Sequence, residues 1–128
     1  MELEMRRTLA ERCMGWTGTK SMTATWYAED NDHLGYRIKD AEYETGPKDC
    51  LDWHPDTDWQ QCGMVIERMQ GRGWNSTADI TATSGVQVVF WRIDEDGEAI
   101  THSVTADTFT EAVSLAAALA LEATDEQS

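Results

Sequence analysis

The stretch from Asp52 to Trp74 constrains the fold of this 128-residue chain most strongly, because it encodes a helix with marked ends. Apolar side chains recur there every three or four residues, as they do on one face of an α-helix. They are Trp59, Cys62, Val65, Ile66 and Met69. Asp56 or Thr57 can cap the amides of the first turn, and two glycines after the stripe suit a helix end. The pattern predicts a helix over residues 57–71.

Three strands and a second helix are expected after this helix. Apolar and polar residues alternate between residues 74 and 106, with turn signals at Ser84-Gly85 and at Asp94–Gly97. Thr108 and Glu111 form a capping box at the start of an alanine-rich helix over residues 108–122. We expect a three-stranded antiparallel meander with both helices on its even-numbered face. The predicted core residues are Ile66, Met69, Ile80, Val88, Phe90, Val104 and Val113.

The N-terminal part predicts a helix and a β-hairpin. Residues 2–14 have helical periodicity, and residues 22–27 and 34–39 alternate like two strands around a polar turn. Residues 41–52 have no period and are expected to be an ordered loop. The fold class is therefore α+β, in the order α-ββ-α-βββ-α. We expect one domain over residues 1–128: helix and hairpin at 1–52, an α-βββ-α core at 53–122, and a polar tail at 123–128.

The middle strand of the meander is apolar on both faces. Its odd-numbered residues Val89, Trp91 and Ile93 point away from the two helices and need a cover. The N-terminal helix or the first hairpin can supply it, which gives an α/β/α sandwich. A second copy of the chain is the other candidate, so the sequence leaves a homodimer open.

The chain is strongly acidic. It has 24 Asp and Glu against 10 Lys and Arg, a net charge of −14. This balance opposes direct binding of nucleic acid, whose phosphates require basic side chains, and favours a basic protein partner. Three cysteines argue against a secreted disulfide framework. No export signal and no apolar run of about 20 residues is visible, so we expect a cytoplasmic protein without a membrane partner.

Metal and catalytic signals are weak. Cys50, His54 and Cys62 are zinc-ligand types, yet a fourth ligand and a paired Cys-x2-Cys motif are missing. His102 lies on the predicted core face, and no nucleophile can be paired with it. We therefore expect no metal, no cofactor and no enzyme activity.

The candidate binding residues are acidic turns and N-terminal aromatic side chains. Acidic residues gather in two hairpin turns, at Glu29, Asp30 and Asp32 and at Asp94, Glu95, Asp96 and Glu98. The aromatic candidates are Trp16, Trp26 and Tyr27. These aromatic residues form a binding patch if exposed, and otherwise they help to cover the second sheet face.

Several short motifs together resemble a family of small phage proteins with an α/β/α sandwich domain, most of unknown function. They are the helix entry Trp53–Asp58, Glu67–Met69 with Gly73-Trp74, the strand Val88–Trp91, and Thr108 with Glu111-Ala112 and Ala116. The resemblance covers about residues 50–121. It implies a phage or prophage origin and carries no catalytic residues to transfer.

These observations favour a small acidic phage accessory protein. The leading hypothesis is a non-catalytic inhibitor, a nucleic-acid mimic of the anti-CRISPR or anti-restriction type. Its expected partner is a host protein with a basic nucleic-acid-binding groove. The alternative is a self-assembling or virion-associated accessory protein with no inhibitory role.

Overall fold

The computed structural model describes residues 3–20, 24–28, 35–39, 51–81 and 85–126. The N-terminal part contains α1 (Leu3–Thr8), the π-helical turn η1 (Leu9–Cys13) and the strands β1 (Thr17–Lys20), β2 (Ala24–Ala28), β3 (Gly35–Lys39) and β4 (Leu51–Asp52). The remaining elements are α2 (Trp59–Gly71), β5 (Asn75–Thr81), β6 (Gly85–Ile93), β7 (Ala99–Ala106) and α3 (Phe109–Glu126). The α+β fold class is confirmed.

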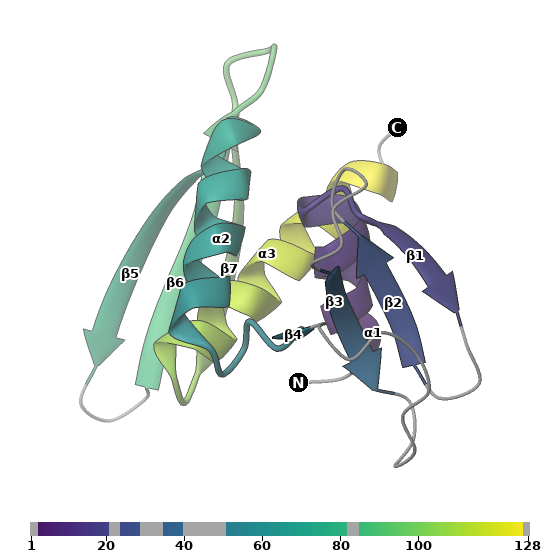
Figure 1. Ribbon diagram of the computed structural model, residues 1–128. Coiled ribbons are helices and arrows are strands. Elements are labelled where there is room, and N and C mark those ends of the chain that lie inside the picture. Colours follow the sequence, from purple (N-terminus) through teal and green to yellow (C-terminus); the bar gives the residue numbers. More distant parts are fainter. Residues whose placement is uncertain (1–2, 21–23, 29–34, 40–50, 82–84, 127–128) are drawn as a thin grey trace.

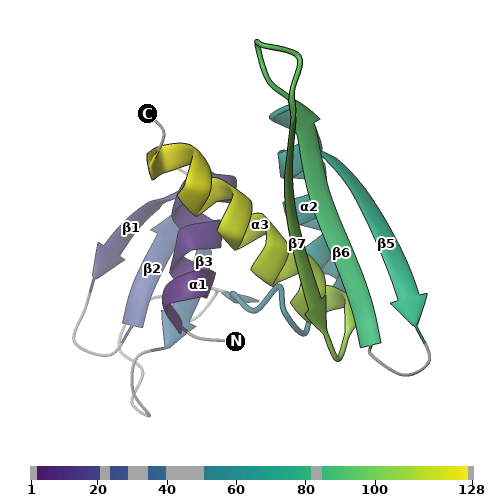
Figure 2. The same ribbon diagram turned by 180° about the vertical axis from the view of Figure 1, so that it is seen from behind.

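Two sheets flank a group of helices (Figures 1 and 2). One sheet has the strand order β1-β2-β3-β4, and the other has the order β5-β6-β7 with antiparallel pairing throughout. The second sheet is the predicted meander, and β2 and β3 are the predicted first hairpin. The strands β1 and β4 were not predicted, and they widen the hairpin into a four-stranded sheet.

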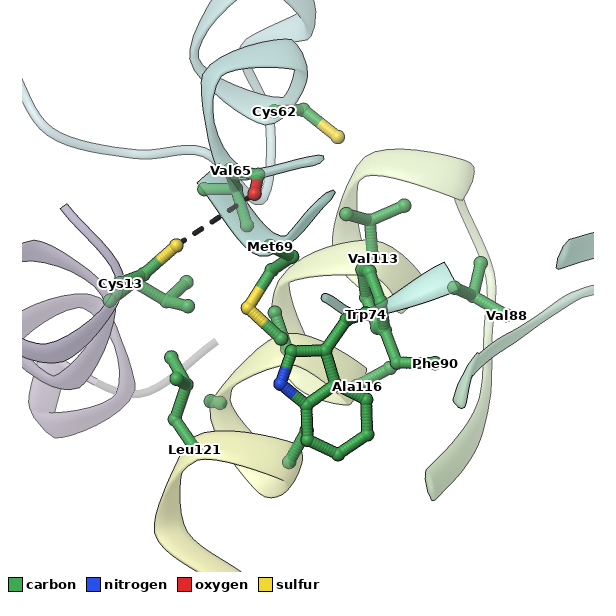
Figure 3. Packing of buried hydrophobic residues seen from close by; sticks show 14 of the residues in the cluster. Cys13, Cys62, Val65, Met69, Trp74, Val88, Phe90, Val113, Ala116 and Leu121 are labelled. Atoms are coloured by element: carbon green, nitrogen blue, oxygen red, sulfur yellow. Dashed lines mark hydrogen bonds between the residues drawn. The ribbon is translucent and has the colours of Figure 1, made fainter. Parts of the chain in front are cut away.

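The alanine-rich helix α3 is the most central element. Its residues Ala112, Val113, Ala116, Ala117, Ala118, Ala120 and Leu121 are all buried. One side of α3 packs on β6 and β7, and the others contact α2 and η1. Small side chains let neighbouring elements approach α3 closely from several directions. Figure 3 shows Val113, Ala116 and Leu121 of α3 beside Met69 of α2, Phe90 of β6 and Trp74.

The start of α2 differs from the prediction in its cap. The cap is Asp58, whose Oδ1 accepts a hydrogen bond from the Gln61 amide at 2.9 Å. Asp56, one of the two predicted caps, instead forms an ion pair with Arg6. The helix therefore begins at Trp59 rather than at residue 57. The predicted cap at Thr108 is confirmed, since its Oγ1 accepts from the Glu111 amide at 3.2 Å.

Most predicted core residues are buried, and one is not. Met69, Val88, Phe90 and Val113 are at most 1% exposed, and Ile66 and Val104 are partly buried against the core. The prediction for Ile80 is wrong, because this side chain is 77% exposed. Ile80 lies near the end of the edge strand β5, whereas α3 covers β6 and β7. Trp59 of the predicted apolar stripe is also exposed, and its ring stacks on Phe109 at 5.3 Å between centroids.

Of the two candidate covers of the outer sheet face, the intramolecular one, by the N-terminal helix or the first hairpin, is wrong, and the second copy of the chain stays a prediction. The helix formed by α1 and η1 packs against α3 and, through α1, against β3, so it lies on the helical side of the meander (Figure 2). The physical reason is the second apolar face of α3, which buries Leu9, Ala10 and Cys13 of η1. None of the described elements covers the outer face of the meander. The predicted polar tail is shorter than expected, because α3 continues to Glu126.

Candidate binding surface

The turn between β6 and β7 is ordered by hydrogen bonds within the turn itself. The Asp94 carboxylate oxygen Oδ1 accepts hydrogen bonds from the amides of Asp96 and Glu98, both at 2.9 Å. The Asp94 amide donates to the Glu98 carbonyl at 2.9 Å, and Gly97 takes the positive φ of 81° that the turn requires. These bonds fix the backbone that carries the remaining carboxylates.

We call residues 94–98 the acidic tip. It projects beyond the C-terminal end of α2 in both ribbon views (Figures 1 and 2). Glu95, Asp96 and Glu98 are exposed, whereas Asp94 is half-buried. Four carboxylates in five residues, held on an ordered and protruding hairpin, form a concentrated negative surface.

The outer sheet face lies directly below this tip. We use this name for the outward-pointing side chains of β5, β6 and β7, which centre on Val89, Trp91 and Ile93. Trp91 pairs with Asn75 on one side and with Thr101 on the other. Val89 pairs likewise with Thr77 and Ser103. Asp79 is the only charged residue among the outward-pointing positions of these strands.

The outer sheet face therefore differs from the rest of this acidic chain. Ile93 is 57% exposed, and Val89 and Trp91 are half-buried between their cross-strand neighbours. A central tryptophan, few charges and a rim of small polar residues are the composition found in protein–protein interfaces. Together the two surfaces offer an apolar contact beside a negative projection.

On the opposite, helix-facing side of the meander, side chains pack beneath the strands that carry the acidic tip. The Arg92 guanidinium lies 4.8 Å from the ring centroid of Trp74, and His102 lies 5.7 Å from the same ring. Burial first, and the nearby Arg92 charge second, lower the pKa of His102 below its usual 6.5. The Arg92–Trp74 contact packs the start of β5 against the end of β6, so the hairpin leaves the sheet from a packed support.

Of the predicted binding residues, the structure describes the side chains of the acidic tip and of Trp16. Trp16 is 4% exposed and stacks on Tyr36 at 4.4 Å between centroids, so the prediction that it offers a surface contact is wrong. Its ring also meets the edge of Trp53 at 4.9 Å. Trp26 and Tyr27 belong to β2, but their side chains lie outside the described part of the structure. The other predicted acidic turn, Glu29, Asp30 and Asp32, lies outside the described residues.

The structure describes Cys62 and His54, two of the three residues considered for zinc binding. Cys62 is fully buried, and burial raises the pKa of its thiol to about 11. The His54 ring is hydrogen-bonded through Nδ1 to Thr57 Oγ1 at 2.9 Å. Cys50 lies outside the described residues. Within the described ranges, no three His, Cys, Asp or Glu side chains are placed to hold a metal ion.

The outer sheet face has a usable signal in the sequence. Val89, Trp91 and Ile93 alternate with the buried Val88 and Phe90, so the middle strand had to present apolar groups on both sides. The sequence alone left open whether an element of the same chain or a second copy of the chain covers the face of Val89, Trp91 and Ile93.

Comparisons of the chain with protein-family models, with curated proteins and with solved structures found no match. Among the described residues, no helix has the length and apolar character needed to cross a membrane.

Proposed function

We propose that the protein is a non-catalytic inhibitor that binds a basic, nucleic-acid-handling protein of a bacterial host. The proposed target belongs to a defence complex of the CRISPR or restriction type, and the proposed place of action is the host cytoplasm. The supporting observation is the acidic tip, an ordered hairpin turn that projects the exposed carboxylates of Glu95, Asp96 and Glu98 from the body of the molecule. The proposed phage or prophage origin rests on the resemblance of short sequence motifs to those of small phage proteins.

The acidic tip suits a groove lined by Lys and Arg. Such grooves normally hold phosphates, and exposed carboxylates on a rigid turn present the same charge to the same side chains. The turn is ordered by its own hydrogen bonds, so little conformational entropy is lost when it binds. Because these carboxylates are exposed to solvent, their main effect is to accelerate association and to exclude wrong partners.

The outer sheet face supplies the second part of the proposed interface. Trp91 and Ile93 lie on β6, which leads directly into the acidic tip, so one partner can contact both surfaces. An apolar contact of this kind slows dissociation, whereas the tip accelerates association. The proposed partner therefore presents an apolar area with Lys or Arg beside it.

Self-assembly through the outer sheet face is the second candidate function, since that face is uncovered by the described elements. Two arguments oppose it. Three strands of up to nine residues give a footprint of roughly 400 Å², below the approximately 800 Å² per partner of a stable interface. A two-fold axis along the strands brings two acidic tips together. A two-fold axis across the strands brings each tip toward Asp79 and Asp107 of the other copy, both exposed.

The test is capture from a bacterial lysate that carries a CRISPR or restriction system, with identification by mass spectrometry. We expect capture of a nucleic-acid-binding complex at low salt and loss of that complex at high salt. The triple variant Glu95→Lys, Asp96→Lys, Glu98→Lys should lose the complex at low salt as well. A phage-plating assay in the same strain should show that this variant no longer protects a targeted phage.

The matched control is the triple variant Glu4→Lys, Glu11→Lys, Asp107→Lys. It changes the net charge equally at exposed positions outside the acidic tip, and it should retain capture. Equal loss in both triple variants would attribute binding to net charge alone. Unchanged capture and phage protection by the folded tip variant would rule out groove binding through this turn.

A further inference from the structure

A pocket lies between the N-terminal helix and α2, on surfaces that the proposed interface does not use. Its volume is about 510 Å³, within the usual range of small-molecule sites. Its wall combines Cys13 and Met14 at the end of η1 with Met64, Glu67, Arg68 and Arg72 of α2. Two elements distant in sequence therefore meet around one concave space.

The charge of the pocket is opposite to that of the whole chain. Its lining contains two guanidinium groups, Arg68 and Arg72, and one carboxylate, Glu67. The chain carries a net charge of −14, so a locally cationic concave site is unusual for it. Guanidinium groups recognise carboxylates and phosphates through paired hydrogen bonds.

One of the two arginines is held at the pocket wall. Arg72 Nη2 donates a hydrogen bond to the Cys13 carbonyl oxygen at 3.1 Å, which joins the end of α2 to the end of η1. This bond uses one of the five N–H donors of a guanidinium group. The orientation of Arg72 is therefore fixed by the protein before any ligand arrives, which lowers the entropic cost of binding.

Three of the residues that line the pocket, Cys13, Met14 and Met64, carry sulfur and no charge. Cys13 points from the N-terminal helix toward α2, with its Sγ 3.8 Å from the Val65 carbonyl oxygen (Figure 3). Burial raises the pKa of the Cys13 thiol to about 11, although Arg72 and Arg68 oppose this increase. The uncharged thiol therefore adds no negative charge to the wall beside the two arginines. The Met14 side chain is buried and that of Met64 is half-buried, so thioethers complete the apolar wall.

The backbone beside the pocket is a π-helix rather than an α-helix. The Met14 amide bonds to the Leu9 carbonyl at 3.0 Å, and the Trp16 amide bonds to the Ala10 carbonyl at 3.1 Å. These wide turns place Cys13 and Met14 where they line the pocket. Short π-helical segments occur frequently at functional sites.

We propose that this pocket binds a small organic anion, with its carboxylate or phosphate on Arg68 and Arg72 and its apolar group against Met14 and Met64. The ligand class is defined by the shared chemistry of a compact anionic group on a short apolar stem.

The test uses phenyl phosphate, benzoate and benzyl alcohol as probes in NMR titrations of the full chain. We expect saturable shifts of the backbone amides of residues 68–72 and of the Met14 and Met64 methyl groups. Phenyl phosphate or benzoate should cause them, and benzyl alcohol should not. The more tightly bound anion identifies the preferred headgroup.

The variant Arg68→Gln should weaken binding about tenfold or more, since it removes a charged hydrogen-bond donor. The control Arg92→Gln removes an equal charge outside the pocket and should bind normally. Arg72→Lys keeps the positive charge and tests whether binding requires the oriented guanidinium group. Thermal unfolding checks that each variant is folded. No saturable shift with either anion, or equal binding by Arg68→Gln and wild type, would overturn the proposal. Equal saturation by benzyl alcohol would overturn it as well.

Discussion

Arg6 and Asp56, which are 50 positions apart in the sequence, form a bidentate ion pair. Arg6 Nε and Nη2 each donate to a separate carboxylate oxygen of Asp56 at 3.1 Å. The Asp56 carbonyl also accepts a hydrogen bond from Thr110 Oγ1 at 2.7 Å, and the Trp53 indole donates to the Arg6 carbonyl at 2.9 Å. Asp56 therefore connects α1 and the first turn of α3 at the entry to α2.

Replacement of Asp56 by alanine should lower the free energy of unfolding by about 2 kcal/mol, because hydrogen bonds to a charged group are lost from a buried position. Urea unfolding monitored by tryptophan fluorescence measures this change. Arg6→Lys keeps the charge but removes the paired geometry, so it should be intermediate. Asp79→Ala, at an exposed position, is the matched control. Equal urea midpoints for Asp56→Ala and Asp79→Ala would show that the ion pair adds no stability.

Two apolar residues on the same face of the meander should respond very differently to truncation. Phe90→Ala should cost about 3–5 kcal/mol, because Phe90 is fully buried in the core. Ile80→Ala should change stability by less than about 0.5 kcal/mol, because Ile80 is 77% exposed. Chemical denaturation of both variants compares these costs. A large loss for Ile80→Ala would mean that another chain or segment covers this residue in solution.

The meander and its two helices could be predicted because their signals are local. The even-numbered pattern of β6, the turn at Asp94–Gly97 and the cap at Thr108 are each read from neighbouring residues. The location of the N-terminal helix could not be predicted in this way. Its position depends on the second apolar face of α3. An alanine-rich face does not indicate which element of the chain packs against it. Asp56 illustrates the same limit, since its partner Arg6 lies 50 positions away.

The candidate surface was partly visible in the sequence. The acidic composition of residues 94–98 was clear, and so was the apolar outer side of β6. Which of the other candidate side chains lie at the surface depends on tertiary packing, which local sequence patterns do not show. Trp16 was treated as a surface candidate, yet it stacks on Tyr36 in the interior. Trp59 was treated as a core residue, yet α2 begins there and leaves its ring 69% exposed.

Purified protein should contain no stoichiometric zinc. Cys62 is buried with a raised thiol pKa, which opposes the thiolate form that zinc requires. Elemental analysis measures the metal content, and thermal unfolding with and without a chelator should give the same Tm. One zinc per chain, together with a lower Tm in chelator, would overturn this prediction.

His102 should titrate below its usual pKa of 6.5, because burial and the Arg92 charge both disfavour its protonated form. The folded state therefore favours the neutral ring. The stability that this residue contributes is complete above pH 6.5 and is lost as the pH falls through the folded-state pKa. NMR of the His102 ring across this range measures the midpoint. Arg92→Gln should raise the pKa only partly, since burial is the larger cause, whereas Arg72→Gln should leave it unchanged. A midpoint at or above 6.5 in the wild-type protein would contradict the packing of His102 beside Trp74 and Arg92.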